Sequence, residues 1–115
     1  MTTFNLPDGP AVLDHFSPSE FRGWADRMAR DQLFLLDPFR TEWGAPVYIS
    51  PVKGSLGRHA GESLSQHNYD RWGEVRASDI FPEGIGPENF PKAYAIADKI
   101  GAGGFGIYTD TTIGS

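Results

Sequence analysis

The spacing of apolar and polar positions changes several times along the chain, and each change marks an expected element. Residues 1–14 carry Pro and Gly without helical periodicity, which predicts an extended arm. Ser17 and Glu20 have the spacing of a capping box, and Pro18 suits the first helical position, so a helix is expected to begin here. Its apolar stripe continues to about residue 29 through Phe21, Trp24, Ala25 and Met28.

A second helix is expected over roughly residues 31–43. Its apolar positions are Leu33, Leu36, Phe39 and Trp43. Pro38 is expected to kink or restart this helix, because proline supplies no backbone donor. Gly44 is placed to end it, since glycine accepts the left-handed conformation common after a helix.

The remaining pattern predicts short strands at residues 47–49, 75–81 and 105–108, with a third helix at 88–100. The segment from residue 50 to 73 is rich in Gly, Ser, His and Asn and has little periodicity. A loop of this length in a small domain is usually functional. We therefore expect one α+β domain over residues 1–115, with a small, mainly antiparallel sheet and two N-terminal helices and one later helix packed on it.

Composition narrows the classes of partner. The 115 residues fit one domain, and the 39% hydrophobic content argues against disorder. The net charge of −5, with no run of Lys or Arg, argues against nucleic acid as a partner. Residues 1–12 lack the pattern of a signal peptide, and no apolar run approaches the roughly 20 residues of a membrane span.

The most informative chemistry lies in the segment from Ser65 to Asp79. His67 stands in the polar loop, and Asp79 enters the apolar pair that follows it, on a predicted strand. Because the chain has no cysteine, any zinc must be held by His, Asp or Glu, and a catalytic zinc usually has three such ligands. His67 and Asp79 are candidates for two of them, and hydrogen bonds that orient these ligands are expected from Asn68, Ser65 and Ser78. The alternative is a loop histidine and an aspartate bonded to backbone.

Other residues of the same loop have more than one interpretation. His59 is a candidate third ligand, a substrate contact or an exposed loop residue. Arg58 suits bidentate binding of a substrate carboxylate, or is a solvated loop arginine. The candidates for a general base are Asp70, Glu62 and Glu74.

Ser65-x-His67, followed by Ala77-x-Asp79-Ile80, resembles the first zinc motif of a peptidase family. That family contains the zinc D-Ala-D-Ala carboxypeptidases and the endolysin-type L-alanyl-D-glutamate endopeptidases of bacteriophages. Further likenesses bring the resemblance to residues 16–108. They are the opening helix at 16–21, the second helix and first strand at 36–47, and the glycine-rich strand at 103–108.

The resemblance implies roles for three residues. His67 would be the first zinc ligand and Asp79 the second, while Arg58 would bind a substrate carboxylate. The zinc would polarise the scissile carbonyl and lower the pKa of its bound water toward neutrality. The expected substrate is the stem peptide of bacterial peptidoglycan. The protein would then be a phage lysin or a virion-associated hydrolase, located in the virion or in the host cytoplasm and acting at the cell wall.

Two departures from the family keep a second hypothesis open. Eleven residues separate His67 from Asp79, where the family commonly has six. No histidine follows His67, although the family takes its third ligand from a later strand, so the C-terminal end of the family domain is expected to be absent. The alternative is a non-catalytic structural or cell-wall-binding virion protein, with virion neighbours and an incomplete metal site.

Overall fold

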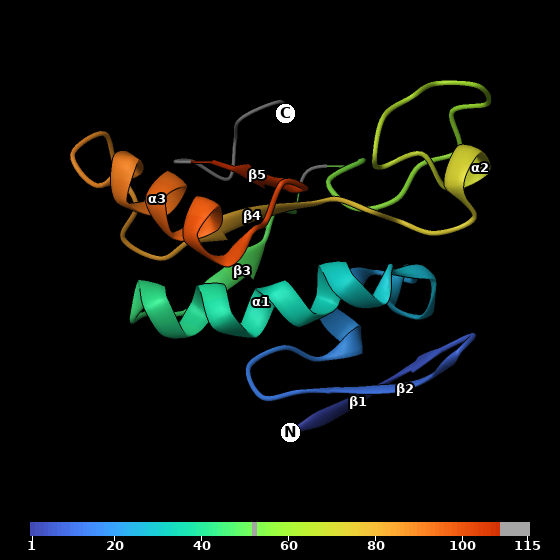
Figure 1. The fold of residues 1–115 in the computed structure, drawn as a ribbon, viewed down its shortest axis with the longest axis horizontal. Helices are drawn as coiled ribbons and strands as arrows, with labels where there is room; N and C mark the ends of the chain where they lie inside the picture. The colour runs from blue at the N-terminus through green and yellow to red at the C-terminus, as the bar shows by residue number, and fades with distance from the viewer. Residues whose placement is uncertain (52, 109–115) are drawn as a thin grey trace.

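Helix α1 (Arg30–Trp43) crosses the molecule between an N-terminal hairpin and a three-stranded sheet (Figure 1). The computed structural model describes residues 1–51 and 53–108, and it confirms the α+β class. Within these residues, no helix has the length and apolarity required to cross a membrane. The other elements are β1 (Thr2–Leu6), β2 (Gly9–Leu13), the 3-10 helices η1 (Pro18–Phe21) and η2 (Ala25–Arg27), β3 (Val47–Ile49), α2 (Tyr69–Trp72), β4 (Ser78–Pro82), α3 (Phe90–Ile100) and β5 (Phe105–Ile107).

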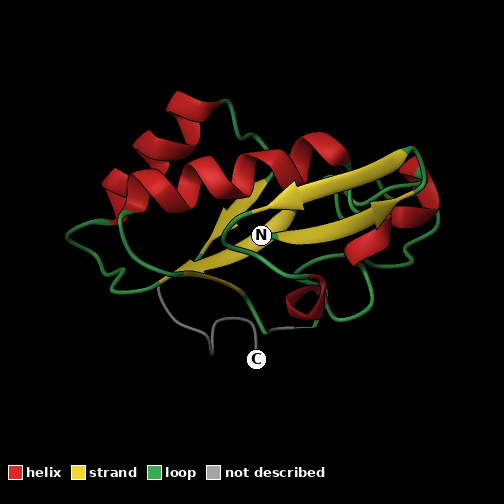
Figure 2. Ribbon diagram, turned by 90° about the horizontal axis from the view of Figure 1, so that it is seen from below, coloured by secondary structure: helices red, strands yellow, loops and turns green. Residues whose placement is uncertain are grey.

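The N-terminal arm is extended, as predicted, but it is folded back on itself as a hairpin. Strands β1 and β2 pair antiparallel, and viewed from their side they lie in front of α1 (Figure 2). Alternate side chains point into the core, namely Phe4, Leu6, Ala11 and Leu13. Arg30 of α1 ties down the turn, because its Nη2 pairs with Asp8 Oδ1 at 2.9 Å and donates to the Gly9 carbonyl. The pairing therefore depends partly on a residue of a distant element.

The first N-terminal helix does not run continuously to residue 29, which corrects the sequence expectation. The predicted start is confirmed, since the Ser17 N–H donates to Glu20 Oε2 at 2.7 Å. The helix then breaks at Arg22 and Gly23, whose φ angles are 47° and 89°. Left-handed residues cannot continue a right-handed helix. The break leaves Phe21 fully buried, with its ring edge-on to Phe4 at 5.2 Å.

Helix α1 closely follows the expected second helix. It runs through Pro38 instead of restarting there, and its predicted apolar positions are buried. Gly44 ends it with φ 82°, and the Gly44 N–H donates to the Arg40 carbonyl at 3.2 Å. The buried stripe packs against the core, where the Phe39 and Phe105 rings meet edge-on at 5.7 Å. This helix therefore shares one hydrophobic core with both sheets.

Strand β4 is the centre of the three-stranded sheet, with β3 antiparallel on one side and β5 parallel on the other. It starts at Ser78, not at Val75 as predicted, because Val75 instead forms an isolated bridge with Met28. The register places Gly106 of β5 opposite Asp79. A Cβ built on Gly106 would overlap the Asp79 carboxylate. Glycine at this position therefore leaves space for a charged group at the edge of the core.

We predict that Gly106→Ala destabilises the protein and displaces the Asp79 carboxylate. Overpacking of this kind typically costs about 1–3 kcal/mol. Gly103→Ala is the matched control, because a Cβ there meets no heavy atom within 4 Å. Urea unfolding of the two variants measures the difference. Equal stability of the two variants would contradict the close packing of Gly106 against Asp79.

Candidate metal site

His67 and Asp79 come together, as the sequence analysis proposed. His67 Nε2 lies 3.4 Å from Asp79 Oδ1, and the two side chains are only 12% and 14% exposed. Two ligand atoms on one tetrahedral zinc, each at about 2.0–2.1 Å, are roughly 3.3 Å apart. The observed separation therefore fits two corners of a zinc site without rearrangement.

The orientation of the His67 ring is fixed from behind by the backbone. His67 Nδ1 donates to the carbonyl of Leu56, which can only accept, so Nδ1 carries the proton. In a neutral ring this leaves the lone pair on Nε2, the atom that faces Asp79. A carbonyl behind the second ring nitrogen is the usual arrangement of a metal-binding histidine. The geometry therefore agrees with a role for Nε2 as a ligand.

Asp79 is placed by the middle of the sheet. Its N–H donates to the Ser55 carbonyl at 2.8 Å, and its own carbonyl accepts from the Ser50 N–H at 2.9 Å. Its second carboxylate oxygen, Oδ2, lies 3.5 Å from the Tyr108 hydroxyl. The Asp79 charge, together with burial, raises the pKa of Tyr108, so the phenol remains protonated as a possible donor.

Asn68, next to His67, organises the loop. It is fully buried, and its side chain makes four hydrogen bonds to loop backbone. Oδ1 accepts from the N–H groups of Ala60 at 3.0 Å and Asp70 at 3.2 Å, and Nδ2 donates to the carbonyls of Gly61 at 3.1 Å and Ser63 at 2.8 Å. The buried side-chain amide of Asn68 thereby holds the irregular loop backbone in place, next to the point where the chain turns at His67.

The expectation that Asn68, Ser65 and Ser78 orient the candidate ligands therefore needs correction. Asn68 supports the loop backbone and does not hydrogen-bond either candidate ligand side chain. Ser65 Oγ accepts from the His67 backbone N–H at 3.2 Å and so supports the position of His67, not its ring. Ser78 Oγ is buried and has no hydrogen-bond partner among residues 1–51 and 53–108. Alternation along β4 separates it from Asp79, because adjacent residues face opposite sides.

His59 is not brought to the His67–Asp79 pair as a third ligand. Its Nδ1 pairs instead with Asp70 Oδ1 at 2.7 Å, and its side chain is 60% exposed. The hydrogen bond from His59 lowers the pKa of Asp70. Glu74 is similarly engaged, with Arg76 at 2.8 Å, while Glu62 is exposed. In the described part of the chain, no three His, Asp or Glu side chains are grouped to hold a metal, and residues 109–115 lie outside it.

Arg58 lines a cationic pocket of about 400 Å³ that is also lined by Leu56, whose carbonyl holds the His67 ring. Its backbone N–H donates to the His67 carbonyl at 3.0 Å, and its charge partly offsets the effect of Asp79 on the pKa of Tyr108. The pocket is also lined by residues that the sequence analysis did not select, above all Arg22 and Lys53. They lie more than 30 positions apart in the sequence, and no local pattern connects them.

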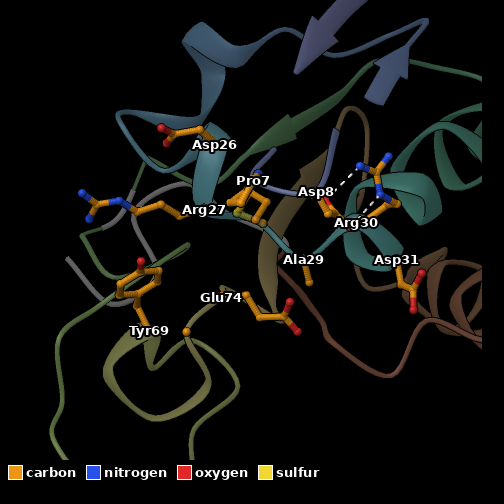
Figure 3. Close-up of a pocket in the computed structure, with 11 residues that line it drawn as sticks. Pro7, Asp8, Asp26, Arg27, Ala29, Arg30, Asp31, Tyr69 and Glu74 are labelled. Carbon is orange, nitrogen blue, oxygen red and sulfur yellow. Dashed lines mark hydrogen bonds and ion pairs between the residues drawn. The ribbon is translucent and has the colours of Figure 1, made fainter. Parts of the chain in front are cut away.

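A second pocket, of about 460 Å³, lies against the start of α1 (Figure 3). It contains neither His67 nor Asp79. Its cations are already engaged, since Arg30 pairs with Asp8 and the Arg27 guanidinium lies 5.3 Å from the Trp24 ring and 5.2 Å from the Tyr69 ring. Neither pocket is lined by the candidate ligands, and the two differ in that the cations of this one already have partners.

Comparison with known proteins gives no relative from which residue roles can be transferred. No protein-family model, no curated protein and no solved structure matches this chain. Interpretation of the site depends on its geometry and on the motif around His67 and Asp79.

We predict that Asn68→Ala weakens both the fold and the position of His67. The substitution leaves four backbone groups of the loop without their partner, and each buried group left unsatisfied costs about 1–3 kcal/mol where water cannot replace the bond. Hydrogen exchange at Ala60 and Asp70, whose N–H groups donate to Asn68 Oδ1, should accelerate by more than 10-fold. Ser63→Ala is the control, because it keeps the Ser63 backbone carbonyl that accepts the hydrogen bond from Asn68 Nδ2. Unchanged exchange in Asn68→Ala would contradict the organising role.

Proposed function

We propose that the protein is a zinc-dependent peptidase that cleaves peptide bonds of bacterial peptidoglycan, of the phage lysin or virion-associated type. The observation that carries the proposal is the 3.4 Å approach of His67 Nε2 to Asp79 Oδ1, with the other ring nitrogen held by a carbonyl. The likeness of the surrounding motif to the zinc peptidases of bacterial cell walls supplies the substrate class.

In this proposal, His67 and Asp79 hold the metal by one nitrogen and one oxygen. The zinc, when bound, supplies a Lewis acid and an acidified water. The described residues do the positioning: the Leu56 carbonyl orients His67, and β4 holds Asp79 in a central strand. Tyr108 donates toward the Asp79 oxygen that does not face His67, so it biases which carboxylate oxygen is available.

Arg58 would draw a substrate carboxylate toward this region. Among the described residues it makes no ion pair, so its charge is available to a ligand. Its backbone is bonded on both sides of Asn68, because its N–H donates to the His67 carbonyl and its carbonyl accepts from the Tyr69 N–H at 2.9 Å. Movement of the arginine backbone is therefore coupled to the candidate ligand.

A non-catalytic role is the second candidate function. It is favoured by the fact that the described residues bring together two ligands, not three. Two protein ligands hold zinc weakly, because a tetrahedral structural or catalytic site normally uses three or four. In this alternative the domain is a structural or cell-wall-binding protein of a virion, and it binds peptidoglycan without cleaving it.

We predict that His67→Ala and Asp79→Ala each abolish hydrolysis of purified peptidoglycan and lower zinc affinity by roughly 100-fold or more, while the domain remains folded. His15→Ala is the control, because His15 lies outside the pair and, among residues 1–51 and 53–108, its one hydrogen bond is from its backbone N–H to Asp37. Zinc titration, release of soluble cell-wall fragments and circular dichroism measure the three properties.

The outcomes separate the two functions. Hydrolysis by a folded His67→Ala protein would overturn the peptidase proposal. Binding of peptidoglycan by the wild-type chain, with no zinc uptake and no cleavage, would instead favour the structural or cell-wall-binding role.

A further inference from the structure

The three-stranded sheet has one face that is turned away from α1. Helix α1 runs along the other side of the sheet, where the Phe105 ring meets it edge-on at 5.7 Å (Figure 1). Phe105 stands opposite Ser78 in the register. Because side chains alternate along a strand, Asp79 and Phe81 project from the opposite face, together with Tyr48, the partner of Phe81 on β3. Asp79 of the candidate metal pair therefore lies on the face away from α1.

Three aromatic side chains stand in a row across this face. The register places Tyr48 of β3 beside Phe81 of β4. Tyr108, just past the end of β5, donates its N–H to the Ile80 carbonyl at 3.0 Å, so it continues the row on the other side of Phe81. Its hydroxyl, 3.5 Å from Asp79 Oδ2, shows that it lies on the same face. Neighbouring strands are about 4.8 Å apart, so the row spans roughly 10 Å.

The row combines accessible rings with polar groups at both ends. The Tyr48 side chain belongs to a residue that is 46% exposed, and Phe81 and Tyr108 are half-buried. The Tyr48 hydroxyl donates to Glu83 Oε2 at 3.1 Å, which holds the ring in place from the end of β4. At the opposite end, the Tyr108 hydroxyl lies beside the Asp79 carboxylate. Each end therefore offers both a hydroxyl and a carboxylate oxygen.

The charge beside the row is mainly negative. The hydrogen bond to Glu83 raises the pKa of Tyr48, and the charge of Asp79 raises the pKa of Tyr108. Nearby arginines lower the same two pKa values, but less strongly. Both phenols therefore remain protonated at neutral pH. The carboxylates would repel an anionic ligand and accept hydrogen bonds from a neutral one.

The form of the row indicates which class of ligand it suits. A stable protein partner covers roughly 800 Å² on each side, much more than three rings provide. An extended peptide gains affinity by pairing its backbone with the edge of a sheet, whereas this row crosses the strands and offers side chains. A sugar ring has an apolar C–H face that can stack on an aromatic ring, with hydroxyl groups around its edge. Aromatic rings flanked by hydroxyl and carboxylate groups match that division.

We propose that Tyr48, Phe81 and Tyr108 form a binding surface for uncharged sugar rings of the glycan strand of peptidoglycan. The inference rests on the proposed function, which makes the bacterial cell wall the substrate. The aromatic rings supply the stacking surface, and Glu83 accepts a hydrogen bond from a sugar hydroxyl. Asp79 lies two residues before Phe81 on the same face, which is roughly 7 Å along β4. Bound glycan would therefore lie beside the candidate metal pair, where a stem peptide attached to it could reach the metal.

The test uses a soluble tetramer of N-acetylglucosamine, which carries no peptide and no charge. It is titrated into the 15N-labelled 115-residue chain without metal, so that binding is measured independently of catalysis. We expect saturable binding, with amide shifts concentrated on β3 and β4. Tyr48→Ala should weaken binding by about 5-fold, as expected for the loss of one aromatic contact. Tyr48→Phe, which keeps the ring, should bind more tightly than Tyr48→Ala.

Phe34→Ala is the matched control. Phe34 is also 46% exposed, but it lies on α1 and not on the row. This variant should keep the affinity of the wild type, and equal weakening by Phe34→Ala and Tyr48→Ala would overturn the surface. Phe81→Leu is a second test, because it removes a ring of the row while keeping an apolar side chain against the core. It should also weaken binding, and urea unfolding establishes that each variant is folded.

The outcomes separate this inference from the peptidase proposal. Sugar binding by a wild-type chain that takes up no zinc and cleaves no peptidoglycan would support the surface and remove the peptidase function. Cleavage of a soluble stem peptide by a chain that binds no sugar would overturn the surface and leave the peptidase function. The inference would also be overturned if Tyr48 proved necessary for binding a sugar-free stem peptide but not for binding the tetramer.

Discussion

The pairing of β4 with β5 is the constraint on which the candidate site depends. It places a glycine opposite Asp79, and a side chain at that position would overlap the carboxylate. A charge at the edge of a core is tolerated only where it has space and polar neighbours. Here the space comes from Gly106 and the neighbours are His67 Nε2 and the Tyr108 hydroxyl. The sheet thus fixes the position of the Asp79 carboxylate, the second candidate ligand.

The second half of the site comes from irregular chain, which requires a different source of order. The buried Asn68 amide replaces the regular backbone pairing that a strand would provide, and the Leu56 carbonyl then sets the His67 ring. Ser55 connects the sheet to the cationic pocket. Its carbonyl accepts a hydrogen bond from the Asp79 N–H, and its hydroxyl accepts one from Arg22 Nη2. One short stretch of loop therefore positions a candidate metal pair and a cationic pocket together.

Sequence reasoning located the elements whose signals are local. Helix α1 follows from helical spacing and Gly44, and β3 from a short apolar run. The break at Arg22 was missed because burial of Phe21 against Phe4, a distant contact, overrides the local pattern. His67 and Asp79 were found through a motif, but their separation depends on strand register. The grouping of Arg22 with Lys53 has no local signal, because the fold alone brings them together.

The central claim is that His67 offers Nε2 to a metal beside Asp79, with Nδ1 protonated against Leu56. Ring nitrogen NMR of the 15N-labelled chain, with one equivalent of zinc, tests it most directly. The three histidines can be assigned by His15→Ala and His59→Ala. The account predicts a zinc-induced shift of His67 Nε2, with Nδ1 still carrying its proton. A response confined to His59, coordination through His67 Nδ1, or no response of His67 to zinc would contradict it.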